Sequence, residues 1–163
     1  MKRPLESSPT GGRVVARLAA AGQVLPDLPE PRGAYALARI DHCILQVSGT
    51  TDRGAAGVSN RGPLQEDVDL DPAKGSARLA ALNVLAAAAS VIDLDSLIGC
   101  VHLRGYVAAA PSFRRHPQVI DAASEVLHVA FAPAAPHTRA AIGVSSLPGG
   151  ALVELEARFA IAP

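Results

Sequence analysis

The sequence predicts an α+β fold in which two long helices cover one face of a mixed β-sheet. Two strand-like segments occur together early in the chain, at residues 35–40 and 43–48. Two long helical patterns follow with a strand between them, and two further strands close the chain. Strands that occur in runs interrupted by helices are typical of α+β domains. At 163 residues, the chain is expected to form one domain around a single core.

The N-terminal part is expected to be an appendage to this domain. Residues 1–33 are predicted to form an arm and a short helix, and residues 34–163 the main domain. Residues 1–11 carry proline, serine, glycine and charge, which is typical of a loose arm. Residues 13–21 are predicted to be the short helix, because Val14, Val15 and Leu18 form an apolar stripe.

The first two strands are predicted to pair through a turn at Asp41-His42. Residues 49–63 then contain five glycines or prolines, which predicts a mobile loop. Asp71 followed by Pro72 is typical of a helix N-cap and first helical position, so a helix is expected from there to about Ile92.

The second half of the chain has the clearest periodicity. Residues 97–107 are predicted to form a strand, and residues 117–131 a helix whose apolar side chains repeat with the helical period. Residues 138–145 and 151–161 are predicted to be a hairpin closed by a Pro-Gly-Gly turn. In its last strand, four apolar residues should lie under the helices: Val153, Leu155, Ala157 and Phe159. The opposite face is polar, and an oligomer could bury it.

Arg139 is the most informative single residue, because its neighbours are all small or apolar. An unpaired guanidinium is costly to remove from water, so Arg139 is expected to have a partner. In the predicted hairpin, Glu156 lies closer to Arg139 than Glu154 does. The partner is therefore either Glu156, with a role in the fold, or the carboxylate of a ligand.

Composition argues against several classes of function. The 15 basic and 15 acidic residues give no electrostatic reason to expect binding to nucleic acid or an anionic membrane. The longest apolar run, residues 79–92, is too short to span a bilayer. No residue spacing suggests a metal site. Cys43 and Cys100 are expected to be buried free thiols, and the start of the chain lacks a signal-peptide pattern, so a cytoplasmic protein is predicted.

Three motifs are informative together. They are Ser48-Gly49 at the end of the second strand, Ala81-Leu82-Asn83 within the first long helix, and Arg139 followed by Leu147-Pro148 and Val153-Glu154-Leu155-Glu156. With these motifs the chain resembles the YjgF/Rid (reactive-intermediate deaminase) family. The resemblance runs from about Tyr35 to Ile161, and the leading helix suggests a divergent branch with an N-terminal extension. It implies a chorismate-mutase-like domain that forms a homotrimer with clefts between subunits.

The resemblance also implies an activity. Better-known family members hydrolyse small 2-imino and 2-enamino acids to 2-oxo acids and ammonia, without a metal or organic cofactor. Two alternatives stand beside this expectation. The first is a non-catalytic trimer that binds a small carboxylate metabolite in the same cleft. The second is an endoribonuclease, as in the older endoribonuclease L-PSP label of the family, which the balanced charge and the absence of a histidine acid–base pair disfavour.

Site residues follow from the resemblance position by position. Arg139 falls on the arginine that binds the substrate carboxylate, and Glu154 on the glutamate associated with the attacking water. Tyr35 and Gly49 fall on positions that line the cleft, with Ser48 beside Gly49.

Of two further positions, Ala141 fits the common family pattern and is expected to contact the substrate, whereas the position on the second long helix departs from it. Ala141 stands where the family often has a small residue or a cysteine. The asparagine expected on the second long helix is not recognisable, and Asp121 or Ser124 lies nearest to its place.

Overall fold

The computed structural model describes residues 12–27, 33–54 and 56–163, so the predicted arm at residues 1–11 lies outside the described residues. In chain order the elements are α1 (Arg13–Ala20), β1 (Ala38–Asp41), β2 (Ile44–Thr51), β3 (Arg53–Gly54), β4 (Gly57–Val58), α2 (Asp71–Ala89), the 3₁₀ turn η1 (Leu94–Ser96), β5 (Leu97–Ala108), α3 (His116–Phe131), β6 (Thr138–Val144), the 3₁₀ turn η2 (Pro148–Gly150) and β7 (Val153–Ile161).

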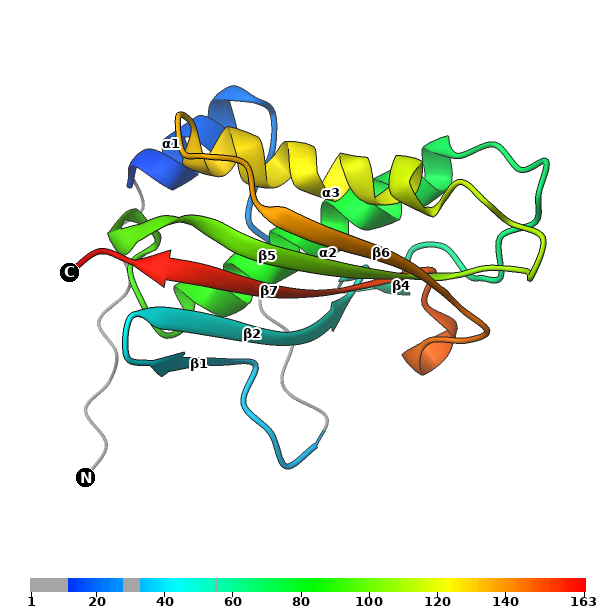
Figure 1. Cartoon of the computed structure of the whole chain (residues 1–163), viewed down its shortest axis with the longest axis horizontal. Helices are drawn as coiled ribbons and strands as arrows, with labels where there is room; N and C mark the ends of the chain where they lie inside the picture. Colours follow the sequence, from blue (N-terminus) through cyan, green and yellow to red (C-terminus); the bar gives the residue numbers. More distant parts are fainter. Residues whose placement is uncertain (1–11, 28–32, 55) are drawn as a thin grey trace.

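The main sheet has five strands in the order β1-β2-β7-β5-β6 (Figure 1). Its neighbouring strands are antiparallel except β5 and β6, which run parallel. Helix α3 connects these two strands and returns the chain to the starting end of the sheet, as a parallel pair requires. β3 and β4 form a separate small hairpin.

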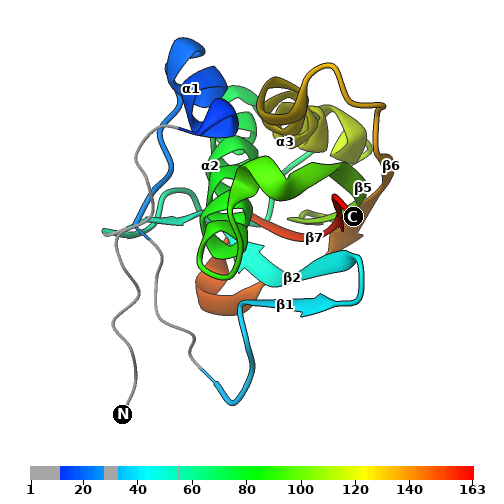
Figure 2. The ribbon, with the colours of Figure 1, turned by 90° about the vertical axis from the view of Figure 1, so that its left-hand side faces the viewer.

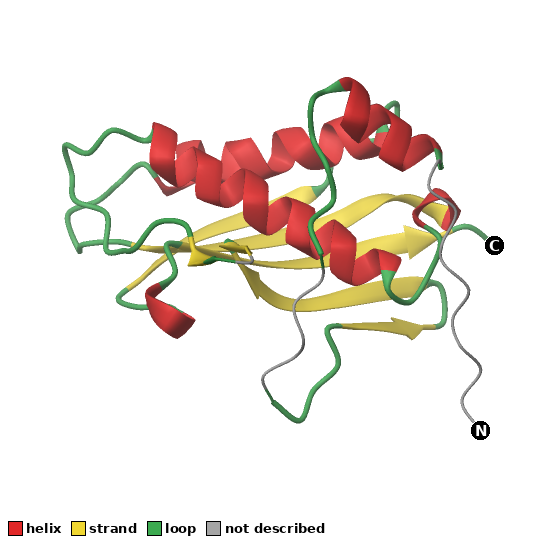
Figure 3. Ribbon diagram, turned by 180° about the vertical axis from the view of Figure 1, so that it is seen from behind, coloured by secondary structure: helices red, strands yellow, loops and turns green. Residues whose placement is uncertain are grey.

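Helices and strands form two layers (Figures 2 and 3). Helices α2 and α3 lie on one face of the sheet, and α1 packs beside α3. The inward residues of β7 are buried as the alternation predicted: Val153, Leu155, Ala157 and Phe159. The α+β class with a mixed sheet and helices on one face is therefore confirmed.

The predicted closing hairpin is wrong. β6 and β7 are not neighbours, because β5 lies between them and pairs with both. The residues between β6 and β7 do not make a tight turn. They contain η2, in which Gly149 and Gly150 have φ angles of 66° and 73°, and they carry the chain around the end of β5.

Several boundaries also differ from the prediction. β1 begins at Ala38, so Tyr35 precedes the strand rather than opening it. Asp71 lies inside the first turn of α2, where its backbone N–H donates to Oδ1 of Asp69 at 3.0 Å. Helix α2 ends at Ala89, three residues short of the predicted Ile92.

The predicted loop at 49–63 is partly ordered structure. β2 continues to Thr51, and Nδ2 of the buried Asn83 donates to the backbone carbonyl oxygens of Thr51 and Arg53 at 2.8 and 2.9 Å. The prediction that both cysteines are buried is also wrong, because Cys43 is exposed beside the β1–β2 turn and Cys100 is only partly buried.

Candidate functional site

Arg139 lies on the outer strand of the sheet and faces the helix layer. Its register partner on β5 is Leu103, which is fully buried under the helices, so both side chains point to the same face. Nη1 of Arg139 donates to Oδ1 of Asp121 at 2.6 Å and to Oγ of Ser124 at 3.0 Å. The intrachain partner of Arg139 is therefore Asp121, and the predicted Glu156 is wrong.

The guanidinium keeps donors available. Its Nε–Nη2 edge has no hydrogen-bond partner among the described residues, and 24% of the side chain is exposed. This edge offers two parallel N–H groups, the arrangement that grips a carboxylate in a bidentate way. Arg139 is thus held by α3 at one nitrogen and open to solvent at the other edge.

A second hydrogen bond extends this cluster to a histidine. Oγ of Ser124 lies 3.0 Å from Nε2 of His137, two residues before Arg139. Burial, with the nearby charges of His128 and Arg139 adding to it, lowers the pKa of His137 to about 4. His137 is therefore neutral at pH 7. Its Nε2 can accept a hydrogen bond from the Ser124 hydroxyl, while the Ser124 oxygen accepts one from Arg139. Helix α3 orients Arg139 through these hydrogen bonds.

Ala141 lies on the same side of β6 as Arg139, and it packs against the core. Two residues further, Gly143 faces His116 so closely that a Cβ atom would overlap the imidazole ring. Beyond Arg139, the helix side of β6 therefore carries only small residues.

Glu154 lies on the opposite face of the sheet. It is a half-buried residue of β7, paired across the strands with Thr51 and Tyr106. A Cβ atom at Gly49 would overlap Oε1 of Glu154, so a side chain at this position would force the Glu154 carboxylate to move. Burial, and secondly the charge of Glu156, raise the pKa of Glu154. Among the described residues, the Glu154 carboxylate makes no ion pair or hydrogen bond.

Glu156 belongs to a different cluster on the same open face. Nη1 of Arg104 lies 3.5 Å from its Oε2, and the hydroxyl of Tyr106 donates to its Oε1 at 3.4 Å. Arg104 and Glu156 form a partly exposed ion pair across β5 and β7. The two glutamates of the closing motif thus differ, because Glu156 has a cationic partner and Glu154 has none in the described chain.

Tyr35 and Ser48 line a shallow hollow of about 520 Å³ beside β1 and β2, together with Arg39 and Gln46. The hydroxyl of Ser48 donates to the backbone oxygen of Ala36 at 2.7 Å, which ties the segment before β1 to β2. Half of the Tyr35 side chain is exposed, so its ring is available to a ligand or to another chain.

The predicted site residues therefore fall into two groups. Arg139 and Ala141 lie at the β6 edge on the helix side, whereas Glu154, Gly49, Ser48 and Tyr35 lie along β7, β2 and the segment before β1. β5 and β7 separate β6 from β2, which corresponds to roughly 14 Å across the sheet. Within one chain, Arg139 and Glu154 are on opposite faces and do not meet.

Asp121 and Ser124 are the site residues that the motifs left undecided. The sequence placed them only as the nearest candidates for the family asparagine, and the structure brings both to Arg139. Their spacing of three residues on a helix was the available signal, because such residues share a helix face.

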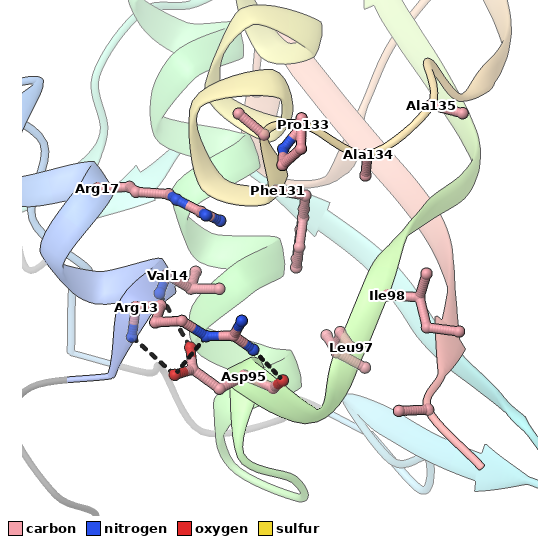
Figure 4. Close-up of a pocket in the computed structure, with 12 residues that line it drawn as sticks. Arg13, Val14, Arg17, Asp95, Leu97, Ile98, Phe131, Pro133, Ala134 and Ala135 are labelled. Carbon is pink, nitrogen blue, oxygen red and sulfur yellow. Dashed lines mark hydrogen bonds and ion pairs between the residues drawn. The ribbon is translucent and has the colours of Figure 1, made fainter.

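A separate cavity of about 440 Å³ lies between α1, η1 and the end of α3 (Figure 4). Asp95 there accepts the backbone N–H groups of Arg13 and Val14 at 2.7 and 2.9 Å, and it also pairs with the Arg13 guanidinium. The two backbone hydrogen bonds hold the pKa of Asp95 below its usual range, although burial acts in the opposite direction. The interactions fix α1 to the domain, and none of the predicted site residues lines this cavity.

No three His, Cys, Asp or Glu side chains in residues 12–27, 33–54 and 56–163 gather as a metal ion would need. Over the same part of the chain, no helix combines the length and apolar character required to cross a membrane.

Known proteins match the chain over most of its length. Protein TCP17 of Trypanosoma cruzi is 32% identical over 148 residues, which cover 90% of this chain and 92% of that protein. Atu1372 of Agrobacterium tumefaciens, a protein of unknown function, is 32% identical over 92% of each chain, with a TM-score of 0.80. A Shewanella oneidensis protein described as a "putative endoribonuclease" is 25% identical over 92% of this chain and all of that one, with a TM-score of 0.86.

No family model matches the sequence. The five-stranded mixed sheet under a layer of helices nevertheless defines a chorismate-mutase-like α+β domain. The chain belongs to the YjgF/Rid family, also called the endoribonuclease L-PSP family.

Proposed function

We propose that the protein is a cofactor-free hydrolytic deaminase of small 2-imino and 2-enamino acids, which it converts to 2-oxo acids and ammonia. The observation that carries this proposal is the state of Glu154. This carboxylate is half-buried, has no cationic partner among the described residues, and has a raised pKa. Such a carboxylate is suited to accept a proton from water near neutral pH.

The chemistry requires little beyond holding the substrate and placing a water molecule. The open edge of Arg139 binds the substrate carboxylate. Glu154 takes a proton from water as the water oxygen attacks C2 of the iminium form. Glu154 then returns the proton to the nitrogen of the carbinolamine. As the C–N bond breaks and ammonia leaves, the carbinol hydroxyl gives its proton to Glu154 and becomes the carbonyl of the 2-oxo acid, and this proton departs with ammonia as ammonium. An enamine substrate first takes a proton from solvent at C3 to give the same iminium.

The proposed cleft forms between subunits of a homotrimer. Arg139 and Glu154 lie on opposite faces of one sheet, so one cleft can contain both only if two chains contribute. The β6 edge of one subunit would supply Arg139 and Ala141. The open face near β2 of the next would supply Glu154, Gly49, Ser48 and Tyr35.

The test generates 2-aminoacrylate in situ with a PLP-dependent dehydratase and follows the decay of the intermediate. The full chain should accelerate the decay, and Arg139→Ala should abolish the acceleration. Decay at the uncatalysed rate with the native protein would refute the deaminase and leave a non-catalytic carboxylate-binding trimer. Sedimentation as a monomer at assay concentration would refute both, because the cleft requires two chains.

The names of the structural neighbours make an endoribonuclease the second candidate. Binding to RNA should weaken steeply with salt, because each phosphate contact releases counterions. With 15 basic and 15 acidic residues, the chain is expected to bind RNA poorly even at low salt. Salt-sensitive RNA binding together with cleavage would favour the nuclease over the deaminase.

A further inference from the structure

The Arg139 corner contains a negative charge as well as a positive one. Asp121 projects from α3, and its side chain is 56% exposed. Its Oδ1 accepts from Arg139, while its Oδ2 has no hydrogen-bond partner in the described part of the chain. A carboxylate beside the arginine is not what a site for a simple anion requires, because it repels the ligand that the arginine attracts.

A ligand with both charges on neighbouring atoms suits this pair. Arg139 presents its free Nε–Nη2 edge with two donors. Asp121, whose Oδ1 accepts from Nη1 of Arg139, presents its free Oδ2 as an acceptor. A carboxylate on the first and a protonated nitrogen on the second would each gain a charge-assisted hydrogen bond. The complementary ligand is therefore a small zwitterion.

We propose that Asp121 is a specificity-determining residue, which binds the protonated nitrogen of the ligand whose carboxylate is held by Arg139. The ligand class rests on the proposed function, since a 2-iminio acid carries its nitrogen on C2, next to the carboxylate carbon. The 2-oxo product has an oxygen in that place, which can accept but not donate a hydrogen bond. Asp121 thus favours substrate over product and promotes release of the 2-oxo acid.

Ser124 makes this role of Asp121 testable. Because Nη1 of Arg139 also donates to Ser124, the guanidinium keeps a second anchor when Asp121 is changed. In Asp121→Asn the side-chain oxygen can still accept from Arg139, so the substitution removes the charge and preserves the shape. Glu125→Gln is the matched control, since Glu125 lies on the same helix and pairs with Arg78 at 3.4 Å.

The experiment measures the binding of alanine and of pyruvate by calorimetry. These probes share a three-carbon skeleton and a carboxylate, and they differ in having an ammonium or an oxygen on C2. The native chain and Glu125→Gln should both bind alanine roughly tenfold or more tightly than pyruvate. Asp121→Asn should bring the ratio of affinities close to one, because alanine binding weakens while pyruvate binding holds or improves.

Two results would overturn the role of Asp121: a ratio of affinities that Asp121→Asn leaves unchanged, whether or not both affinities fall equally, or a ratio near one in the native protein. An equal loss would make Asp121 a positioning residue for Arg139 alone. The decay assay with 2-aminoacrylate separates this outcome from failure of the deaminase. Native acceleration with an unchanged ratio refutes only the role of Asp121, whereas an Asp121-dependent preference for alanine without acceleration refutes only the deaminase.

Discussion

The Arg139 corner and the Glu154 corner are built in opposite ways. Arg139 stands on an outer strand and is held by a helix through Asp121 and Ser124. Glu154 stands on a central strand, on the face without helices, and packs against Gly49. The first corner offers a cation already balanced by an acid, and the second offers a carboxylate without a cationic partner among the described residues.

In the proposed deaminase, this difference assigns substrate binding to Arg139 and proton transfer to Glu154. A paired guanidinium with one free edge can bind a carboxylate and remain oriented while it does so. An unpaired, half-buried carboxylate with a raised pKa is a better proton acceptor than an ordinary surface glutamate. Because the two lie on opposite faces, neither can complete a reaction with the other in an isolated chain.

The largest effect is expected for Glu154→Gln. Losing the general base should lower kcat by roughly 10²- to 10⁴-fold, with KM nearly unchanged because Arg139 still holds the substrate. Steady-state kinetics with the coupled dehydratase would measure this. A change confined to KM would show that Glu154 only binds.

Glu156→Gln is the control within the same motif, and its expected effect is on pH dependence. The native rate should fall as pH drops through the raised pKa of Glu154, since the base must be ionised. Glu156 contributes to that raised pKa, so its neutralisation should move the acid limb to lower pH while activity persists. An acid limb that stays in place would contradict the assignment of Glu154 as the titrating group.

Arg139→Ala should lower kcat/KM by an amount that corresponds to about 2–5 kcal/mol of transition-state stabilisation, because the substrate carboxylate loses its charged partner inside the proposed cleft. The loss should appear mainly in KM if Arg139 holds the substrate equally in the ground and transition states. Arg78→Ala is the matched control, because Arg78 pairs with Glu125 on the exposed surface of the helix layer. Equal losses in the two variants would mean that Arg139 serves only the fold.

Gly49→Ala should reduce kcat by roughly ten- to a hundredfold, because the added methyl group displaces the Glu154 carboxylate. Gly54→Ala places a methyl group in open space and should leave the rate unchanged. Thermal unfolding of both variants would separate a local displacement from a loss of folding. A fully active Gly49→Ala enzyme would contradict close packing of Gly49 against a catalytic carboxylate.

The smallest effect concerns stability at the Arg139 corner. The folded pKa of His137 is about 4, against 6.5 for an unperturbed histidine, so the unfolded chain binds the proton more readily. Stability should be complete above pH 6.5 and fall progressively towards pH 4. A full shift corresponds to roughly 3 kcal/mol, which partial exposure reduces to about 1–2 kcal/mol. The free energy of unfolding of His137→Gln should therefore fall by about 1–2 kcal/mol less than that of the native protein between pH 6.5 and pH 4. Denaturant titrations at several pH values would measure this difference.

The sequence predicted most of the helices and strands, whereas the roles of Arg139 and Glu154 stay predictions. The apolar alternation of β7 and the helical period of α3 are local patterns that burial enforces, so they could be read directly. The Pro-Gly-Gly turn was misleading, because pairing between strands is a long-range property. The predicted strands left only residues 146–150 between them, a length that a hairpin allows, whereas in the structure eight residues separate Val144 from Val153.

The partner of Arg139 could not be predicted for the same reason. Once β5 lies between β6 and β7, Glu156 faces Arg104 and Arg139 turns to α3. The spacing of residues along β6 and β7 contains no information on which partner each of these side chains has. Arg139 and Glu154 lie on opposite faces of the sheet, and this placement, rather than their spacing in the sequence, means that a cleft containing both needs two chains.

Subunit complementation tests the two-chain cleft most directly. Arg139→Ala and Glu154→Gln should each be inactive, and the two proteins would be mixed at equal amounts under conditions that allow subunit exchange. If each cleft takes Arg139 from one chain and Glu154 from another, random association restores both native residues in roughly one cleft in four. Recovery of about a quarter of the native 2-aminoacrylate hydrolysis is therefore expected, and a mixture without activity after full exchange would contradict the shared cleft.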